Sequence, residues 1–190
     1  MLESKNMKKK LHHKQKIKLI SFKTKNLKKK QISSICKLKN SFWPWTIKKQ
    51  QEWFREKVKK TDINNMLILN KKLIGYTLLR KRKSFINNKS LTYYYFDTFI
   101  IHSKFRNKGF GKILVLFNNK ILKKLKKHSF LTCEKKTIPF YLKFDWKIIP
   151  KKKFKIMDHK PTFFRSKADV FGMTYSLDRR IKRQILYYLN

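Results

Sequence analysis

The feature that most constrains this chain is a pair of glycines, Gly109 and Gly111, in the segment HSKFRNKGFGKILV (102–115). The whole sequence has only four glycines. An aromatic, β-branched run (91–101) precedes the pair, and apolar residues at helical spacing follow it (111–127). Glycine permits positive φ and lets amide N–H groups converge without side chains between them. The sequence therefore predicts a buried strand, a loop, and a helix whose N-terminus can bind a phosphate or pyrophosphate.

Two common phosphate-binding loops do not fit this segment. A P-loop requires G-x-x-x-x-G-K-[ST], but Ile113 follows Gly111 and Lys112 here. The dinucleotide-binding fingerprint requires a third small residue at the position of Leu114. The pattern that remains is R-x-x-G-x-G, which runs from Arg106 through Gly111.

The rest of the chain alternates between predicted strands and predicted helices, which indicates a mixed α and β fold with one sheet. We expect strands at 17–22, 66–69, 73–83, 91–101, 129–133, 146–149 and 170–177. We expect helices within 25–42, at 46–61 with Thr46 as N-cap, at 111–127, at 137–144 with Thr137 as a possible cap, and at 181–189. A polar turn, NKK, joins the strands 66–69 and 73–83 into a hairpin.

The ends of the chain and its cysteines indicate domain organisation and compartment. We expect a basic flexible tail at 1–16, one domain at 17–178 and a C-terminal helix at 179–190. The first residues lack the apolar segment of a secretion signal, and no apolar run approaches the ~20 residues that span a bilayer. Cys36 and Cys133 have no partners at metal-ligand spacing, so we expect no metal site, free thiols and a cytoplasmic location.

The charge of the chain is extreme, with 51 Lys and Arg against 10 Asp and Glu, a formal net charge of +41. One interpretation is an anionic partner, such as nucleic acid, a nucleotide or a membrane surface. The other is drift in composition, because an AT-rich coding sequence also yields many Lys, Asn and Ile and a single alanine, Ala168. The sequence leaves both interpretations open. Lysine runs at 28–30 and 151–153 are expected to be solvated faces.

The R-x-x-G-x-G segment, between a buried strand and an apolar-faced helix, resembles the acetyl-CoA pyrophosphate loop of the GNAT superfamily of N-acyltransferases. The strand SFLTC and the later FYLKFDW (140–146) are similar to a strand, helix and aromatic turn of that family. The resemblance covers roughly 17–178 and implies an α/β (α+β) fold, with a single mixed central sheet of about seven strands flanked by helices. The chain departs from the family at Glu134, where many members carry Asn, and at Asp145, where glycine usually ends the helix. Asp tolerates a left-handed cap better than most residues do.

The resemblance implies acetyl-CoA as co-substrate, bound by the loop and its flanks. The residues expected to contact it are Ile101, His102, Arg106, Asn107, Lys108, Gly109, Phe110, Gly111 and Lys112. The implied chemistry is direct attack of an amine on the thioester. The amine must first lose a proton, since an alkylammonium has a pKa of about 10.4 in water. The thioester oxygen needs a donor, usually a backbone N–H of the splayed fourth strand, and the departing thiolate needs an acid.

Tyr141 is the expected acid. By the resemblance, its position in FYLKF is that of the tyrosine that reaches the cofactor sulfur, and a phenol can protonate a leaving thiolate. The alternative is an ordinary buried tyrosine in an aromatic-rich chain.

Asp97 is the expected base, or the anchor of a water relay to the amine. Asp is disfavoured in strands, yet Asp97 interrupts YYYFDTFII. It stands nine residues before Arg106, as an acid does in some aminoglycoside-modifying members of the family. Strict alternation would place Tyr95, Asp97, Phe99 and Ile101 on one face. The alternatives are a structural carboxylate paired with a lysine, and His102 as a weaker candidate base.

These observations predict an N-acetyltransferase that moves an acetyl or other short acyl group from acyl-CoA to an amine. A field of +41 repels polycations, so we expect a neutral or anionic acceptor, such as a nucleotide-linked amino sugar or a protein N-terminus held near RNA. Trp43, Trp45 and Trp53 lie in a region that overlies the acceptor pocket in the family, although core packing explains each of them equally well. The alternative function is a non-enzymatic, basic nucleic-acid-binding protein that retains the fold.

Overall fold

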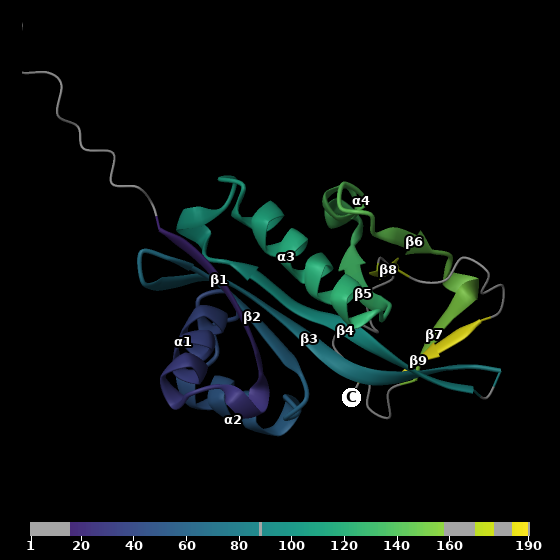
Figure 1. Ribbon diagram of the computed structural model, residues 1–190, viewed down its shortest axis with the longest axis horizontal. Coiled ribbons are helices and arrows are strands. Elements are labelled where there is room, and N and C mark those ends of the chain that lie inside the picture. The colour runs from purple at the N-terminus through teal and green to yellow at the C-terminus, as the bar shows by residue number, and fades with distance from the viewer. Residues whose placement is uncertain (1–15, 88, 158–169, 177–183, 190) are drawn as a thin grey trace, which may run out of the picture.

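The structure is a computed structural model that describes residues 16–87, 89–157, 170–176 and 184–189. It contains one mixed sheet with helices on both faces (Figure 1). The strands are β1 (Ile17–Lys23), β2 (Ile63–Leu69), β3 (Lys72–Ile86), β4 (Lys89–Ile101), β5 (Ser129–Glu134), β6 (Lys147–Ile149), β7 (Phe154–Ile156), β8 (Val170–Tyr175) and β9 (Ile185–Tyr187). The α-helices are α1 (Lys29–Asn40), α2 (Ile47–Lys57), α3 (Phe110–Leu125) and α4 (Ile138–Leu142).

The first four strands form an antiparallel meander, and β5 then joins β4 in parallel after the crossover helix α3. The order across the sheet is β1-β2-β3-β4-β5-β8-β6, and β9 pairs with β3 and β7. The predicted hairpin at the NKK turn is confirmed. Asn70 and Lys71 have φ of 47° and 67°, the left-handed pair that a two-residue hairpin turn needs.

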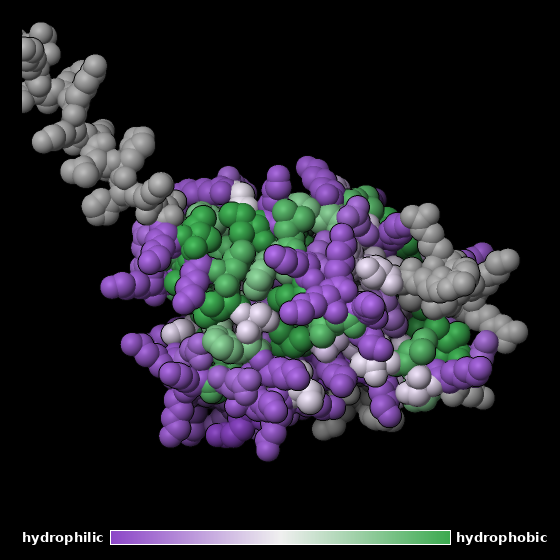
Figure 2. All heavy atoms as spheres, viewed as in Figure 1, coloured by the Kyte–Doolittle hydropathy of each residue, from purple (hydrophilic) through white to green (hydrophobic). Residues whose placement is uncertain are grey.

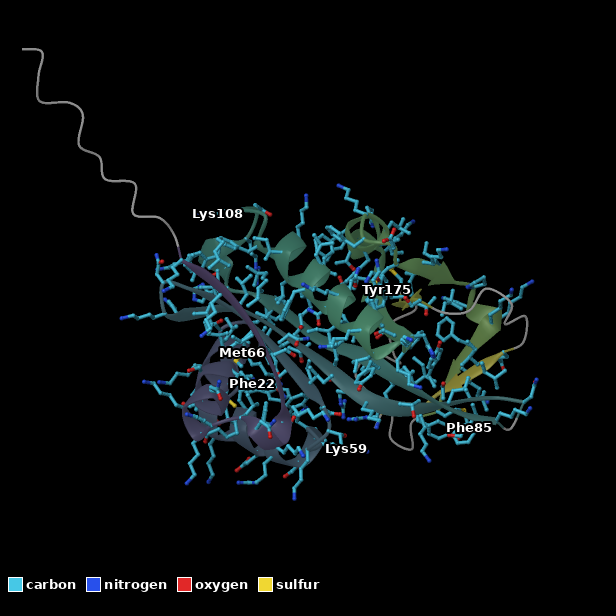
Figure 3. All side chains as sticks on the ribbon, viewed as in Figure 1. Phe22, Lys59, Met66, Phe85, Lys108 and Tyr175 are labelled. Atoms are coloured by element: carbon cyan, nitrogen blue, oxygen red, sulfur yellow. The ribbon has the colours of Figure 1, made fainter. Side chains whose placement is uncertain are left out.

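The helices cover opposite faces of the sheet, α1 and α2 on one face and α3 and α4 on the other (Figure 1). Met66 and Phe22, labelled in Figure 3, belong to the core beneath α1 and α2. The Thr46 cap is confirmed, because its side chain accepts a hydrogen bond from the N–H of Lys49 at 3.2 Å. Thr137 occupies the N-cap position of α4 as expected, but its side chain makes no capping hydrogen bond, because its hydroxyl donates to the carbonyl of Glu134.

Buried amides fix α3 and α4 against the sheet. Oδ1 of Asn118 on α3 accepts hydrogen bonds from Asn65 at 2.7 Å and from Thr77 at 2.8 Å. Asn119 donates to the carbonyl of Phe144 and accepts from the indole of Trp146, both just after α4. The side-chain amides of Asn118 and Asn119 are both hydrogen-bonded through their oxygen and their nitrogen, and such paired buried groups hold α3 in one position.

The C-terminal segment differs from the prediction. Residues 185–187 form β9 and not part of a helix, and β7 adds a further strand that the sequence pattern did not indicate. Tyr187 is fully buried and stacks on Phe130 with ring centroids 4.0 Å apart, so packing in the sheet outweighs the local helical pattern. The rest of the expected helix at 179–190 lies outside the described residues, apart from 184 and 188–189, and the expected tail at 1–16 does so apart from Lys16.

Hydrophilic side chains surround α1 and α2, while hydrophobic ones gather along α3 and β1 on the face shown in Figure 2. Ile17 of β1 and Leu116 of α3 have 43% and 46% of their surface exposed. Among the described helices, none has both the length and the apolar character needed to cross a membrane.

Candidate active site

A V-shaped opening separates β4 from β5. The two strands pair only where Tyr94 meets Ser129 and Tyr95 meets Phe130. Beyond that point β4 runs on to Ile101 and β5 to Glu134, with no further pairing between them in the described residues. The β5-facing backbone N–H and C=O groups of this half of β4 are therefore available to a ligand between the strands.

A β-bulge lies on β4 inside this opening. Thr77 pairs with Phe99 and Leu79 with Phe96, so Asp97 and Thr98 together oppose a single residue of β3. After the bulge, Phe99 and Ile101 pack on the α3 side, in the clusters that contain Phe110 and Leu114. The expectation that Tyr95, Asp97, Phe99 and Ile101 share one face is therefore wrong, because the extra residue reverses the alternation.

The glycine loop, residues 102–109, follows the unpaired end of β4 and leads into α3. Asn107 and Gly109 adopt left-handed φ of 58° and 79°, and Gly109 is the N-cap of α3. No side chain caps the helix, so its first N–H groups are free for an anion, with the positive end of the helix dipole behind them. Arg106, Asn107 and Lys108 are exposed beside it, and Lys108 lies in the loop that precedes α3 in Figure 3.

Gly109 and Gly111 meet different structural requirements. A Cβ at Gly109 would meet nothing within 4 Å, so its backbone angle alone demands glycine. Gly111 has no such angle, and a Cβ there would lie 3.6 Å from the rings of Phe140 and Phe99. Those rings stack on each other with centroids 5.7 Å apart, from α4 and β4 respectively. Gly111 therefore lies against an aromatic pair that links the two sides of the site.

Arg106 connects the loop to both β4 and the α1–α2 connection. Its Nε donates to the carbonyl of Ile101 at 3.1 Å, and its guanidinium carbon lies 5.0 Å from the centre of the Phe42 ring. His102 caps the short turn before Arg106, and its Nδ1 accepts from the N–H of Lys104 at 3.3 Å. Partial burial, then Lys72, Lys104 and Arg106, lower the pKa of His102, which keeps the imidazole neutral at pH 7.

Tyr141 lies on α4 within a shell of aromatic rings. It is 7% exposed and makes ring contacts with Phe96, Phe99, Phe140 and Trp146. Burial, then Cys133 and Tyr95, raise the pKa of its hydroxyl well above 10. The phenol is therefore protonated at neutral pH, which is the state that a proton donor requires. The half-buried Cys133, on β5, also has a pKa raised by burial.

Asp97 lies on the opposite face of β4, toward α1 and α2. Its Oδ2 is 3.3 Å from Nη1 of Arg80, and its Oδ1 accepts from the N–H of Thr98 at 2.8 Å. Lys39 of α1 is buried nearby, and burial lowers its pKa to about 8 while Asp97 is the strongest influence that raises it. The structure thus places the two expected catalytic side chains on either side of β4 and does not bring them into contact.

Comparison with known proteins identifies the family. Residues 32–146 match the model of the acetyltransferase (GNAT) family, and this span is more than half of the chain. The chain belongs to the GNAT acetyltransferase family. Membership makes it an acyltransferase whose acyl donor is an acyl-CoA. A comparison with curated proteins finds no match.

Solved GNAT structures share the fold at low sequence identity. An acyl-CoA N-acyltransferase from Pseudomonas aeruginosa has a TM-score of 0.61 and 12% identity, over 84% of this chain and 99% of that one. The ribosomal-protein-S18-alanine N-acetyltransferase from Escherichia coli has a TM-score of 0.58 and 13% identity, over 87% and 97%. The PaiA N-acetyltransferase from Thermoplasma acidophilum, in complex with coenzyme A, has a TM-score of 0.50 and 17% identity, over 83% and 98%. These likenesses show the fold alone.

The two departures from the GNAT pattern have different structural outcomes. Asp145 adopts a left-handed φ of 65°, as expected for a residue that replaces the usual glycine. Glu134 ends β5 and forms an exposed ion pair with Lys136 at 2.8 Å. Among the described residues, no three His, Cys, Asp or Glu side chains are grouped so that they could hold a metal ion.

Three contacts of this GNAT site were missed by sequence reasoning. Arg80 pairs with Asp97, Phe42 lies under Arg106, and the hydroxyls of Tyr95 and Thr132 lie 3.2 Å apart, from β4 to β5. Each contact joins residues from different elements, so no local sequence motif predicts it. The sequence around Arg80 gave no clear signal, because Arg80 begins the basic run RKRK (80–83) that follows the apolar stretch of β3.

Proposed function

We propose that this protein is an N-acetyltransferase that transfers an acetyl or other short acyl group from acyl-CoA to an amine. The observation that carries the proposal is the opening between β4 and β5, which leads to the uncapped N-terminus of α3 at Gly109. The thioester arm would lie in this opening, and its diphosphate would bind at the N-terminus of α3.

The loop residues are proposed to hold the diphosphate. The N–H groups of Gly109, Phe110, Gly111 and Lys112 would donate to its oxygens, because anions bind at helix N-termini. Arg106, Asn107 and Lys108 would add side-chain donors and positive charge. Ile101 and His102 end β4 where the arm would enter the opening, and the neutral His102 would accept or donate without adding charge.

Acyl transfer in the opening would follow from the positions of β4 and Tyr141. A backbone N–H of β4 would stabilise the oxyanion as the amine attacks and the new C–N bond forms. As the C–S bond breaks, the hydroxyl of Tyr141 would give its proton to the sulfur and later regain one from solvent. Burial in the aromatic shell raises the pKa of the Tyr141 hydroxyl, so the phenol would still carry its proton when the thiolate develops.

Asp97 is proposed to accept the proton of the attacking amine, directly or through a water molecule. Its position on the α1–α2 face would place the base on the side of β4 opposite Tyr141, so that the amine approaches from one face and the thiol leaves toward the other. The ion pair with Arg80 supports the structural alternative, in which Asp97 only neutralises a buried guanidinium.

The acceptor is proposed to be an amino group on a neutral or anionic carrier. A nucleotide-linked amino sugar and a protein N-terminus are the candidates, because a net charge of +41 disfavours encounter with a polycation.

The proposal is tested by thermal shift and by product analysis. Acetyl-CoA at 100 times its Kd should stabilise the fold by about 2.7 kcal/mol, and longer acyl-CoAs show which chain lengths fit. Mass spectrometry of a mixed amine library incubated with acetyl-CoA should then reveal acetylated products. The absence of any shift with acetyl-CoA, propionyl-CoA and free CoA would refute the acyltransferase assignment of this cleft.

A further inference from the structure

A short exposed loop between α1 and α2 carries three large aromatic side chains. We call Phe42, Trp43, Pro44 and Trp45 the aromatic loop. Phe42 is 42% exposed, Trp43 36% and Trp45 52%. Aromatic surface of this size is normally buried, so a contiguous exposed group of such side chains indicates an interaction surface.

The aromatic loop is held in a defined conformation. The carbonyl of Trp43 accepts hydrogen bonds from the N–H of Trp45 at 2.8 Å and from the side-chain amide of Gln50 at 2.9 Å. Gln50 is fully buried, so it anchors the loop to α2. The rings of Phe42 and Trp43 pack edge to face, 4.6 Å apart. A surface ordered before binding loses less conformational entropy when a partner docks.

Positive charge surrounds the aromatic loop. Arg106 is exposed, and its guanidinium carbon lies 5.0 Å from the centre of the Phe42 ring. Lys48 and Lys49 are exposed in the first turn of α2, directly after the loop. A docked apolar protein face would leave these cations desolvated and without anionic partners, which is costly.

We propose that the aromatic loop binds single-stranded RNA, with bases stacked on its exposed rings and phosphates held by the neighbouring Lys and Arg side chains. Single-strand binders combine aromatic platforms with a positive surface, because every base has a face that stacks and every phosphate carries charge. The net charge of +41 supplies the electrostatic attraction for such a polymer across the whole surface. This inference does not rest on the proposed acyl transfer, although Arg106 lies beside the aromatic loop and also beside the N-terminus of α3.

The test must separate stacking from charge, because a chain of this charge binds any polyanion to some extent. The probe is a fluorescently labelled single-stranded oligouridylate, and its Kd is measured by anisotropy across a range of KCl concentrations. Trp45→Ala removes the most exposed ring without changing charge or touching Arg106. Leu142→Ala on α4 is the matched control, because Leu142 is 48% exposed and lies on a different surface.

Trp45→Ala should weaken oligouridylate binding by about 10-fold at every salt concentration, the effect expected for the loss of one stacked base. Leu142→Ala should bind as the wild type does, and the slope of log Kd against log salt should be the same in all three proteins, since no phosphate contact is lost. Both variants should keep the wild-type thermal midpoint. Duplex RNA and inorganic polyphosphate should bind Trp45→Ala and wild type equally, because neither offers an unstacked base.

Equal oligouridylate affinity of Trp45→Ala and wild type would overturn the proposal and leave only charge-driven binding. An equal loss with duplex RNA or polyphosphate would overturn it as well. If Trp45→Ala weakened binding to vesicles of anionic lipid and not to oligouridylate, the loop would be a membrane contact and the RNA assignment would be wrong.

Discussion

The two faces of β4 differ in chemical character, because one is aromatic and the other carries charged side chains. Toward α3 and α4, Phe96 and Phe99 join Tyr141 in an aromatic cluster that keeps the phenol protonated. Toward α1 and α2, Asp97 lies with two buried cations, Arg80 and Lys39, which are 7% and 4% exposed. The face toward α3 and α4 therefore carries a protonated phenol among apolar rings, and the face toward α1 and α2 carries charged side chains.

The bulge at Asp97 and Thr98 produces this division. In a regular strand Asp97 and Phe99 would share one face of β4, opposite the face of Phe96. The extra residue turns Phe99 back to the face of Phe96 and leaves Asp97 with Arg80. Under the roles proposed for Tyr141 and Asp97, a single strand would separate the acid from the base, so that the amine would enter on one side and the thiol would leave on the other.

The largest effect is expected from the aromatic face. Tyr141→Phe preserves the ring and its packing but removes the proton, so kcat should fall by ~10²-fold or more, as is typical of general acid catalysis. The Kd for acetyl-CoA, measured by calorimetry, should stay close to that of the wild type. Full activity of Tyr141→Phe at every pH would show that the acid is another group, with Cys133 as the next candidate.

The glycine loop should give the next largest effect, on binding rather than on turnover. Gly109→Val places a β-branched residue at φ 79°, which costs about 1–2 kcal/mol of stability and displaces the amides of the cradle. Acetyl-CoA should bind at least ~10-fold more weakly, since the helix N-terminus would no longer present its donors together. Gly111→Ala is the control for stability, because its Cβ meets only ordinary contacts at 3.6 Å. Wild-type affinity in a folded Gly109→Val protein would exclude the loop as the diphosphate site.

Local sequence signals predicted the loop and most of the sheet. The left-handed conformations at Gly109 and Asp145 follow from the residue types themselves, and the cap at Thr46 and the apolar face of α3 follow from short-range spacing. These features depend on a few neighbouring residues, so the sequence pattern contains them.

Pairing between distant strands was not predictable in this way. The bulge in β4 depends on its register with β3, and the Arg80–Asp97 contact spans 17 residues along the chain. β9 is a strand because Tyr187 packs on Phe130 and Tyr93, although its own sequence has a helical pattern. Tertiary packing decided each of these features, and single-sequence patterns carry no information about it.

Asp97→Asn tests the role of the charged face of β4, the face toward α1 and α2. If Asp97 takes the proton of the amine, kcat/KM should fall by ~10- to 10²-fold at pH 7 and recover as pH rises, because the free amine becomes abundant without a base. Tyr141→Phe should show no such recovery, which distinguishes the two faces in one pH series. If Asp97→Asn instead lowers the thermal midpoint sharply and leaves the activity of the folded fraction intact, Asp97 serves only to neutralise Arg80.

Lys39 should give the smallest effect, and its sign is informative. Burial lowers the pKa of Lys39 from 10.5 to about 8, so the unfolded chain binds this proton more tightly than the folded one. The contribution of Lys39 to the free energy of unfolding should therefore rise with pH between about 8 and 10.5, and below pH 8 the buried charge opposes folding in full.

Lys39→Met should raise the free energy of unfolding at pH 7 by about 1 kcal/mol. This gain is smaller than the lowered pKa alone implies, because the contact of Lys39 with the Trp53 ring at 3.0 Å is lost. Urea unfolding of both proteins at pH 7 and pH 10 should show a smaller rise for Lys39→Met, with the exposed Lys37→Met as the matched control. A lower stability of Lys39→Met at pH 7 would mean that Trp53 and Asp97 more than compensate the buried ammonium, and the α1–α2 face would then be stabilised by its charges rather than strained by them.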